Sequence, residues 1–198
     1  MSNSHFSFSP MSGRQIDQLA NSYLSYYQPE ALRNPAPFDV HRFVDTKLED
    51  LTGVVPVYSR DLPPEIYGLT DSSENRLEIQ ETLAEDPFQE KFFRSTLAHE
   101  AGHCIIHVPQ LRKINRGHVF RQAKEDGAEG GVKLYRKDDI PLYCNPEWQA
   151  FRFAGALLIP EGPLRMMLAS NASTSEIADT FNIHPAFLRS RMKALKLT

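Results

Sequence analysis

The chain has 198 residues, of which 41% are hydrophobic, so it can bury one compact core with room for a small appendage. Its formal net charge of −3 excludes the strongly basic overall field that favours general nucleic-acid binding. The longest apolar run, around residues 153–159, is too short to cross a bilayer, and no signal-like apolar stretch lies near the start. With only two cysteines, Cys104 and Cys144, the composition predicts a soluble cytoplasmic protein with reduced thiols.

The first part of the chain predicts an arm followed by two helices. Residues 1–13 are rich in serine and have no apolar periodicity, which indicates a disordered N-terminal arm. Residues 15–27 carry apolar side chains at helical spacing and predict a packed helix. Residues 38–51 predict a second helix, and Gly53 is expected to end it.

Three short strand-like runs follow at residues 54–58, 66–70 and 76–80. Residues 71–75 are polar and turn-forming, so they predict the loop of a hairpin. The runs predict a small, largely antiparallel sheet just before the next helix. An edge strand of this sheet could pair with an extended peptide, or it could simply complete the sheet.

A long, half-buried helix is predicted next. Asp86 and Pro87 have the character of a helix cap and a first helical residue, and apolar side chains follow at close to helical spacing. Among them, Cys104 is expected to be a small buried core residue. Pro109 is expected to end the helix, because proline lacks the N–H that an α-helix uses.

Residues 99–103, His-Glu-Ala-Gly-His, form an H-E-x-x-H motif inside this helix. Side chains four residues apart lie on one helix face, so His99 and His103 can bind one zinc ion at about 2.0–2.1 Å from each nitrogen. Zinc lowers the pKa of a bound water to about 7, so Glu100 is predicted to act as the general base. The motif predicts a zinc-dependent peptidase; the alternative is a surface helix with two unconnected histidines.

The segment at 111–143 gives the weakest pattern in the chain. A charged, glycine-containing stretch lies between β-like pieces at 118–120 and 132–135. Two interpretations are open for it: a mobile hairpin that covers the cleft as a flap, or a solvated insertion without a role.

A third zinc ligand is expected, because a catalytic zinc usually has three protein ligands and one water. Asn145 and Pro146 predict the start of another strongly apolar helix. Glu147 lies in its first turn, where an isolated carboxylate on a buried helix is costly unless it is paired or bound to a metal. Alternatively, Glu147 is solvated and interacts favourably with the helix dipole.

Two motifs and the C-terminal tail together resemble the ImmA/IrrE family of metallopeptidases. The first motif is 99–103 with His107 four residues on, and the second, at 147–160, is EWQAFRFAGALLIP. The second is similar to the family's E-x-x-A-N-x-F-A-x-x-L-L-M-P helix. The tail resembles the family's closing helical segment through residues 177–185, Leu188 and Arg191.

This resemblance implies an α+β, zincin-like fold with the sheet packed on the H-E-x-x-H helix and further helices at the C-terminus. It implies a metallopeptidase domain over 14–165 and a packed, helix-turn-helix-like segment over 166–198. It also implies a gluzincin-like zinc site, with Glu147 as the third ligand, in a cytosolic endopeptidase. The implied substrate is a protein such as a helix-turn-helix repressor, with no nucleic-acid or membrane partner.

One position departs from the family pattern. The family usually has Asn four residues after the ligand Glu, where its side chain can hold a zinc-bound His; this chain has Phe151, which cannot hydrogen-bond. For His107, two interpretations are open: a residue that complements the helix dipole and a fourth ligand. The sequence does not select the group that stabilises the oxyanion among His118, Tyr135, Tyr143 and His184.

Two other functions compete with the peptidase. The segment at 175–185 resembles a helix-turn-helix, and Arg189, Arg191, Lys193 and Lys196 follow it, as in a DNA-binding regulator. Apolar side chains such as Phe181 and Leu188 could instead pack the segment onto the peptidase core. The third possibility is a catalytically silent module that binds metal and a partner protein.

Overall fold

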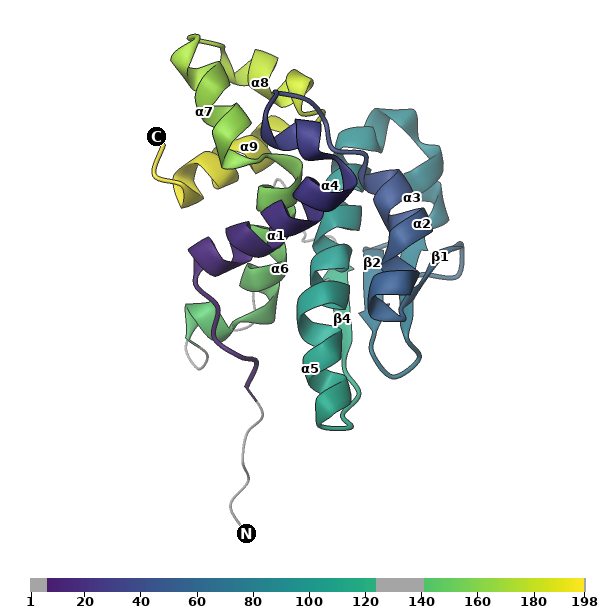
Figure 1. The fold of residues 1–198 in the computed structure, drawn as a ribbon. Helices are drawn as coiled ribbons and strands as arrows, with labels where there is room; N and C mark the ends of the chain where they lie inside the picture. The colour runs from purple at the N-terminus through teal and green to yellow at the C-terminus, as the bar shows by residue number, and fades with distance from the viewer. Residues whose placement is uncertain (1–6, 124–140, 198) are drawn as a thin grey trace.

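The computed structural model describes residues 7–123 and 141–197, which form a mixed α and β structure with one small sheet. Figure 1 shows α4 and α5 as one teal helix through the middle of the molecule. In this view the sheet lies behind and to the right of the helix, and α1 and α6 lie to its left. The elements, in chain order, are α1 (Gly13–Tyr27), η1 (Pro29–Leu32), α2 (Val40–Thr52), β1 (Val55–Ser59), β2 (Ile66–Asp71), β3 (Arg76–Gln80), α3 (Glu81–Glu85), η2 (Pro87–Gln89), α4 (Glu90–Gly102), η3 (His103–His107), α5 (Val108–Lys113), β4 (Val119–Ala123), η4 (Leu142–Cys144), α6 (Pro146–Leu158), α7 (Glu161–Ala169), α8 (Thr174–Thr180) and α9 (Pro185–Ala194).

The first two helices are confirmed, and their ends have local causes. Ser12 and Gln15 form a capping box at the start of α1, which satisfies N–H groups that have no partner within the helix. Asp39 caps α2 in the same way through the N–H of Arg42. Gly53 ends α2 in the left-handed conformation, with φ of 67°, which glycine adopts without a steric penalty.

The sheet contains the three predicted strands and β4, in the order β1-β3-β2-β4. The prediction of a largely antiparallel sheet holds for two pairings, because β2 is antiparallel to both β3 and β4. β1 and β3 run parallel instead, so the sheet is mixed. The predicted 71–75 turn, in which Asp71 accepts the N–H groups of Ser73 and Glu74 and Asn75 is left-handed, joins β2 and β3 as a hairpin. Because β3 lies between β1 and β2 in the sheet, it pairs with β1 as well, and this second pairing is parallel.

The helix that carries the H-E-x-x-H motif is longer than predicted. Asp86 caps the turn η2, which leads into α4, in agreement with the sequence. The prediction that Pro109 ends the helix is wrong, because α4 continues through the π turn η3 into α5. In this π turn the N–H of Val108 bonds to the carbonyl of His103, and Pro109 lies in the first turn of α5, where its missing N–H costs little.

Part of the predicted disordered arm is ordered. The prediction for residues 1–13 does not hold for residues 7–13, which either make defined contacts or belong to α1. Ser9 donates its backbone N–H to Gln110, and Met11 donates its backbone N–H to the carbonyl of Tyr143. Residues 1–6 lie outside the described part of the chain, as does most of the predicted flap, including the β-like piece at 132–135.

The C-terminal helices α7, α8 and α9 gather at one end of the molecule (Figure 1). Phe181 and Leu188 are fully buried, so the helix-turn-helix-like pair α8 and α9 packs onto the core. The guanidinium of Arg191 on α9 is also buried; it lies 2.9 Å from Asp17 of α1 and donates to the carbonyl of Ile159.

Both cysteines are buried and unpaired, and the burial of Cys104 agrees with its predicted place on the apolar face of the helix. In the part of the chain that the structure describes, none of the helices combines the length and the apolar character that a membrane span requires.

Candidate metal centre

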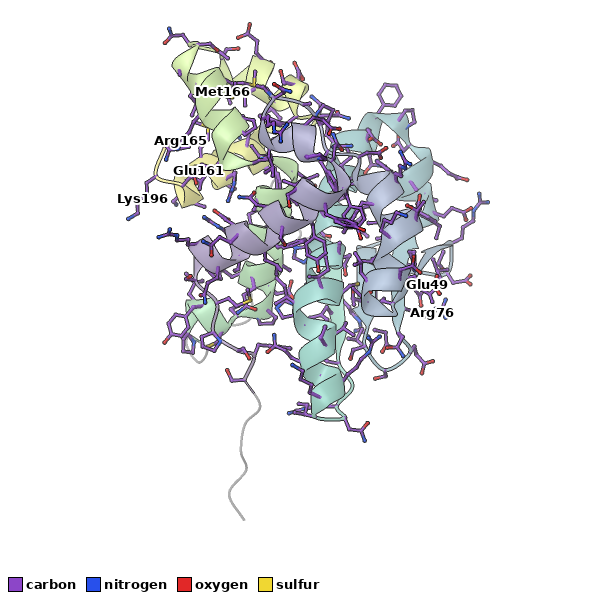
Figure 2. The ribbon with its side chains drawn as sticks, in the orientation of Figure 1. Glu49, Arg76, Glu161, Arg165, Met166 and Lys196 are labelled. Atoms are coloured by element: carbon purple, nitrogen blue, oxygen red, sulfur yellow. The ribbon has the colours of Figure 1, made fainter. Side chains whose placement is uncertain are left out.

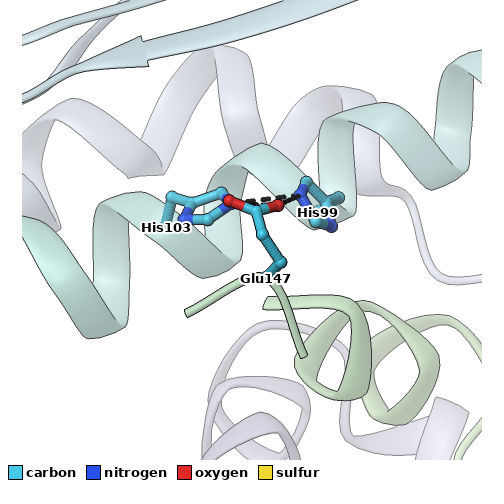
Figure 3. A group of neighbouring side chains, drawn as sticks. All are labelled: His99, His103 and Glu147. Carbon is cyan, nitrogen blue, oxygen red and sulfur yellow. Dashed lines mark hydrogen bonds and ion pairs between the residues drawn. The ribbon is translucent and has the colours of Figure 1, made fainter. Parts of the chain in front are cut away.

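The candidate site lies where α4 meets α6, on the helix flank beside β2. At Gly102 the two helices are so close that a Cβ atom would lie 3.0 Å from the Cα of Ala150. Asn145 accepts the N–H of Trp148 and begins α6, so Glu147 stands in the first turn of that helix. This packing aims Glu147 at the H-E-x-x-H face of α4 (Figure 3).

The structure brings the three predicted ligands together (Figure 3). The Nε2 atoms of His99 and His103 are 3.0 Å apart, and Glu147 Oε2 lies 3.2 Å and 3.4 Å from them. Tetrahedral ligands at about 2.0–2.1 Å from zinc are about 3.3–3.4 Å from one another. The three donor atoms are therefore spaced for one small ion, and the group could hold a metal.

The charges around this group favour a cation. Burial raises the pKa of Glu147, but the neighbouring His103 and His99 outweigh it and lower the pKa well below its usual value. Burial lowers the pKa of His99, and here the carboxylates of Glu147 and Glu100 outweigh it and raise the pKa. An ionised carboxylate that is only 4% exposed is costly unless it is paired, so Glu147 depends on positive charge beside it.

Glu100, the predicted general base, lies beside the group and is fully buried. Its Oε2 accepts a 2.6 Å hydrogen bond from the Thr70 hydroxyl, whereas its Oε1 has no partner among the described residues. Gly68 leaves the space that Glu100 occupies, because a Cβ atom there would lie 2.9 Å from Glu100 Cγ. Burial raises the pKa of Glu100, and the nearby histidines and Thr70 counteract part of that effect. Strand β2 thus positions this carboxylate.

His107 belongs to neither of its two predicted roles. The helix continues past it into α5, so His107 does not stand at a helix C-terminus, and it lies outside the three-residue group. Its Nδ1 is 3.1 Å from His103 Nδ1, and its Nε2 is 2.9 Å from Gln149 Oε1. Burial, reinforced by His103, lowers the pKa of His107 well below its usual value, which favours the neutral imidazole.

Phe151 does not face the site, and its side chain has no polar group that would need a partner there. Its ring packs against Phe187 on α9, at 5.2 Å between ring centroids. His99 Nδ1 is buried and has no hydrogen-bond partner among the described residues. The support that the family's Asn would give to one imidazole is therefore not provided by this position.

Of the candidates for stabilising an oxyanion, His118 lies near the metal-binding group. Its ring is 4.6 Å from that of Phe120, which stacks on His103, and His103 adds to the effect of burial in lowering the pKa of His118. Tyr143 is about half exposed, and His184 accepts the N–H of Ala186 at the start of α9. Tyr135 lies outside the described residues.

Two other carboxylates that could have completed the group are occupied elsewhere. Glu161 pairs with Arg165 at 2.7 Å on α7, at the periphery of the molecule (Figure 2). Asp179 pairs with Lys91 at 2.5 Å. Among the described residues, Glu147 is the carboxylate that joins the two histidines.

Sequence reasoning missed Thr70, Gly68 and Gln149. Thr70 and Gly68 lie in a predicted strand, but no local sequence pattern indicates that they face Glu100. Gln149 lies two residues after Glu147 in the predicted apolar helix, where a buried glutamine amide was a possible indication of a polar network.

Comparison with known proteins adds no relative. A scan against models of protein families finds no match for this chain, and a search of curated proteins finds none either. The resemblance to the ImmA/IrrE family therefore stays a prediction from the motifs.

Proposed function

We propose that this protein is a zinc-dependent endopeptidase. The observation that carries the proposal is the convergence of two imidazole nitrogens and a carboxylate oxygen beside Glu100, whose Oε1 is unpartnered. Two histidines and a glutamate are a ligand set typical of catalytic zinc, which keeps a fourth position for water or substrate. The α+β structure with an H-E-x-x-H helix beside a sheet supports a zincin-like fold with a gluzincin-like site.

The chain's own residues divide the chemistry among them. Bound zinc would supply Lewis acidity, which lowers the pKa of a water and polarises the scissile carbonyl. His99, His103 and Glu147 would hold the ion. Glu100 takes the proton of the attacking water on Oε1 and passes it to the leaving amine, while Thr70 holds Oε2 in place.

The substrate class and the family follow from the resemblance. Both motifs and the tail support membership of the ImmA/IrrE family, and they are more specific together than the H-E-x-x-H motif alone. A helix-turn-helix repressor in the cytoplasm is accordingly the proposed substrate.

A second candidate is a catalytically silent metal-binding module. The burial of the site favours it: Glu100 is 0% exposed and His103 is 1% exposed. A peptide can reach Glu100 only if the residues that cover the site move. A DNA-binding role has less support, because Arg191, one of the basic residues of the tail, is buried against Asp17.

The deciding experiment compares the parent with Glu100→Gln on a peptide library, with cleavage products identified by mass spectrometry. The amide cannot take the proton of water, and loss of a general base typically costs about 10²–10⁴ in rate. We expect equal zinc content in both proteins, cleavage by the parent alone, and no cleavage after chelation. Zinc in both proteins with cleavage by neither supports the silent module, and equal cleavage by both contradicts the role of Glu100.

A further inference from the structure

A chain of buried hydrogen bonds starts at Nδ1 of His103, whereas the other ring nitrogen, Nε2, faces the metal-binding group. His103 Nδ1 is 3.1 Å from His107 Nδ1, and His107 Nε2 is 2.9 Å from Gln149 Oε1. Gln149 Nε2 in turn donates to two backbone carbonyls, those of Ser9 at 3.0 Å and Tyr143 at 2.6 Å. His103, His107 and Gln149 are each at most 1% exposed, so water does not compete for these contacts.

The two carbonyl groups fix the direction of the whole chain. A backbone carbonyl can only accept a hydrogen bond, so the NH₂ end of the Gln149 amide must face Ser9 and Tyr143. The amide oxygen of Gln149 then faces His107, and this oxygen also only accepts. His107 Nε2 must therefore carry a hydrogen and donate it.

The same logic passes through His107 to His103. A neutral imidazole has one N–H and one bare nitrogen, so His107 Nδ1 is the acceptor. His103 Nδ1 must then be the donor, and in the neutral imidazole, which is the form that binds a metal, this leaves His103 Nε2 bare. This bare atom is the one that faces His99 and Glu147.

We propose that His107 and Gln149 are positioning residues that hold His103 in the tautomer whose bare Nε2 is ready to bind a metal, and that the segment at 7–12 closes this relay. The effect on metal affinity rests on the proposed zinc site. The tautomers themselves do not, because they follow from the hydrogen bonds of the metal-free protein.

A π turn and two ring contacts also hold the two histidines of the relay in place. The π turn η3 contains both histidines and sets them side by side, and such turns are frequent at functional sites. Phe120 stacks on the His103 ring at 4.1 Å and 23°, and Phe8 meets the His107 ring edge-on at 4.9 Å. These contacts fix the ring planes of His103 and His107, in addition to the hydrogen bonds that fix the positions of their protons. His99 has no comparable partner for its Nδ1 among the described residues, so the device acts on one of the two imidazoles.

The direct test is long-range ¹H–¹⁵N NMR of the metal-free parent labelled at histidine, at a pH where free imidazoles are neutral. We expect the hydrogen on Nδ1 of His103 and on Nε2 of His107. The opposite tautomer at either residue, or a mixture at both, overturns the proposal. This measurement needs no zinc and no activity, so it is independent of the proposed function.

The companion test measures zinc affinity by competition with a chelator. Gln149→Met removes the relay's fixed end, and loss of such an outer partner typically weakens metal binding about 10–100-fold. Gln28→Met is the matched control, since Gln28 also bridges two backbone groups, Pro37 O and Asp39 N–H, but in the connection between α1 and α2. We expect mixed tautomers and weaker binding in Gln149→Met alone. Equal affinity in both variants, with unchanged tautomers, contradicts the relay.

A pair of substitutions at His107 separates hydrogen bonding from packing. His107→Phe keeps a ring beside Phe120 and Phe8 but removes the acceptor. His107→Asn loses the ring but keeps an oxygen close to the position of Nδ1, so it can still accept from His103. We expect Asn to retain more of the parent's zinc affinity than Phe, and the reverse order would show that only packing matters. A parent that binds no zinc would refute the zinc site and leave the tautomer result standing on its own.

Discussion

The hydroxyl of Thr70 donates a 2.6 Å hydrogen bond to Glu100 Oε2, and this contact makes the two carboxylate oxygens of Glu100 inequivalent. Oε2 is held by the sheet, and Oε1 is left without a partner among the described residues. A general base needs one fixed oxygen to define its position and one available oxygen to take a proton. Strand β2 therefore does more than complete the sheet, because it orients the group that would do the chemistry.

Replacing Thr70 tests this relationship. Thr70→Val keeps the shape of the side chain and removes the donor, so the buried Glu100 carboxylate loses its hydrogen bond, at a cost of about 1–3 kcal/mol. We expect urea unfolding to show a loss of this size and peptide cleavage to slow, with zinc content unchanged. Thr70→Ser keeps the hydroxyl and should stay close to the parent in both measurements. A valine variant that matches the parent in stability and cleavage would show that the contact is incidental.

Gly102 provides a test of the spacing between α4 and α6. An added Cβ would lie 3.0 Å from the Cα and 3.2 Å from the carbonyl oxygen of Ala150, which are backbone atoms that cannot turn aside. Gly102→Ala should therefore separate the helices, cost about 1–3 kcal/mol and weaken zinc binding, because Glu147 moves away from both histidines. Gly162→Ala is the control, since its nearest atom would lie at an ordinary 3.6 Å. Thermal unfolding and zinc titration of the two variants distinguish the outcomes; equal values would contradict the close approach.

The sequence predicted those parts of the fold that have local causes. The apolar periodicity and Gly53 predicted α1 and α2 within a few residues, and β1 to β3 have short apolar runs bounded by turns. The continuation past Pro109 could not be predicted in this way, because the proline rule assumes α-helical bonding and a π turn changes the pairing of carbonyls. The parallel pairing of β1 and β3 depends on how the chain crosses, which no local pattern specifies.

The candidate site also has one part that the sequence predicted and one part that it did not. His99, Glu100 and His103 are specified by spacing on one helix, and Glu147 was reached through the helix cap and the resemblance. The surrounding residues were not reached: Thr70 is brought to Glu100 by the packing of β2, and Gln149 is brought to His107 by the packing of α6. Such contacts join residues far apart in the chain, so only the tertiary structure reveals them.

Asp17 tests whether the C-terminal helices are structural. It pairs with Arg152 of α6 at 2.5 Å and with the buried Arg191 of α9 at 2.9 Å. Asp17→Ala leaves both guanidinium groups without their carboxylate, and breaking a buried pair costs about 3–5 kcal/mol. Asp179→Ala breaks a more exposed pair with Lys91 and should cost at most about 1 kcal/mol. Urea unfolding of the two variants checks this difference; equal stabilities would mean that Arg191 is not anchored and that a nucleic-acid role for α9 deserves a binding assay.

Glu147 gives the sharpest test of the metal centre. Glu147→Gln keeps the size of the side chain but replaces the charged oxygen between the two imidazoles with a neutral and poorer ligand. If Glu147 binds the ion, the variant should lose zinc to a chelator that the parent resists, while His99→Ala and His103→Ala should lose it altogether. Glu161→Gln is the matched control, because Glu161 is a first-turn glutamate of the next helix whose partner is Arg165. If Glu147 only complemented a helix dipole, its replacement would cost about 0.3–1 kcal/mol and leave zinc in place. The burial of Glu147 against both histidines argues against that outcome, and zinc affinity equal to the parent's in Glu147→Gln would refute the three-ligand site.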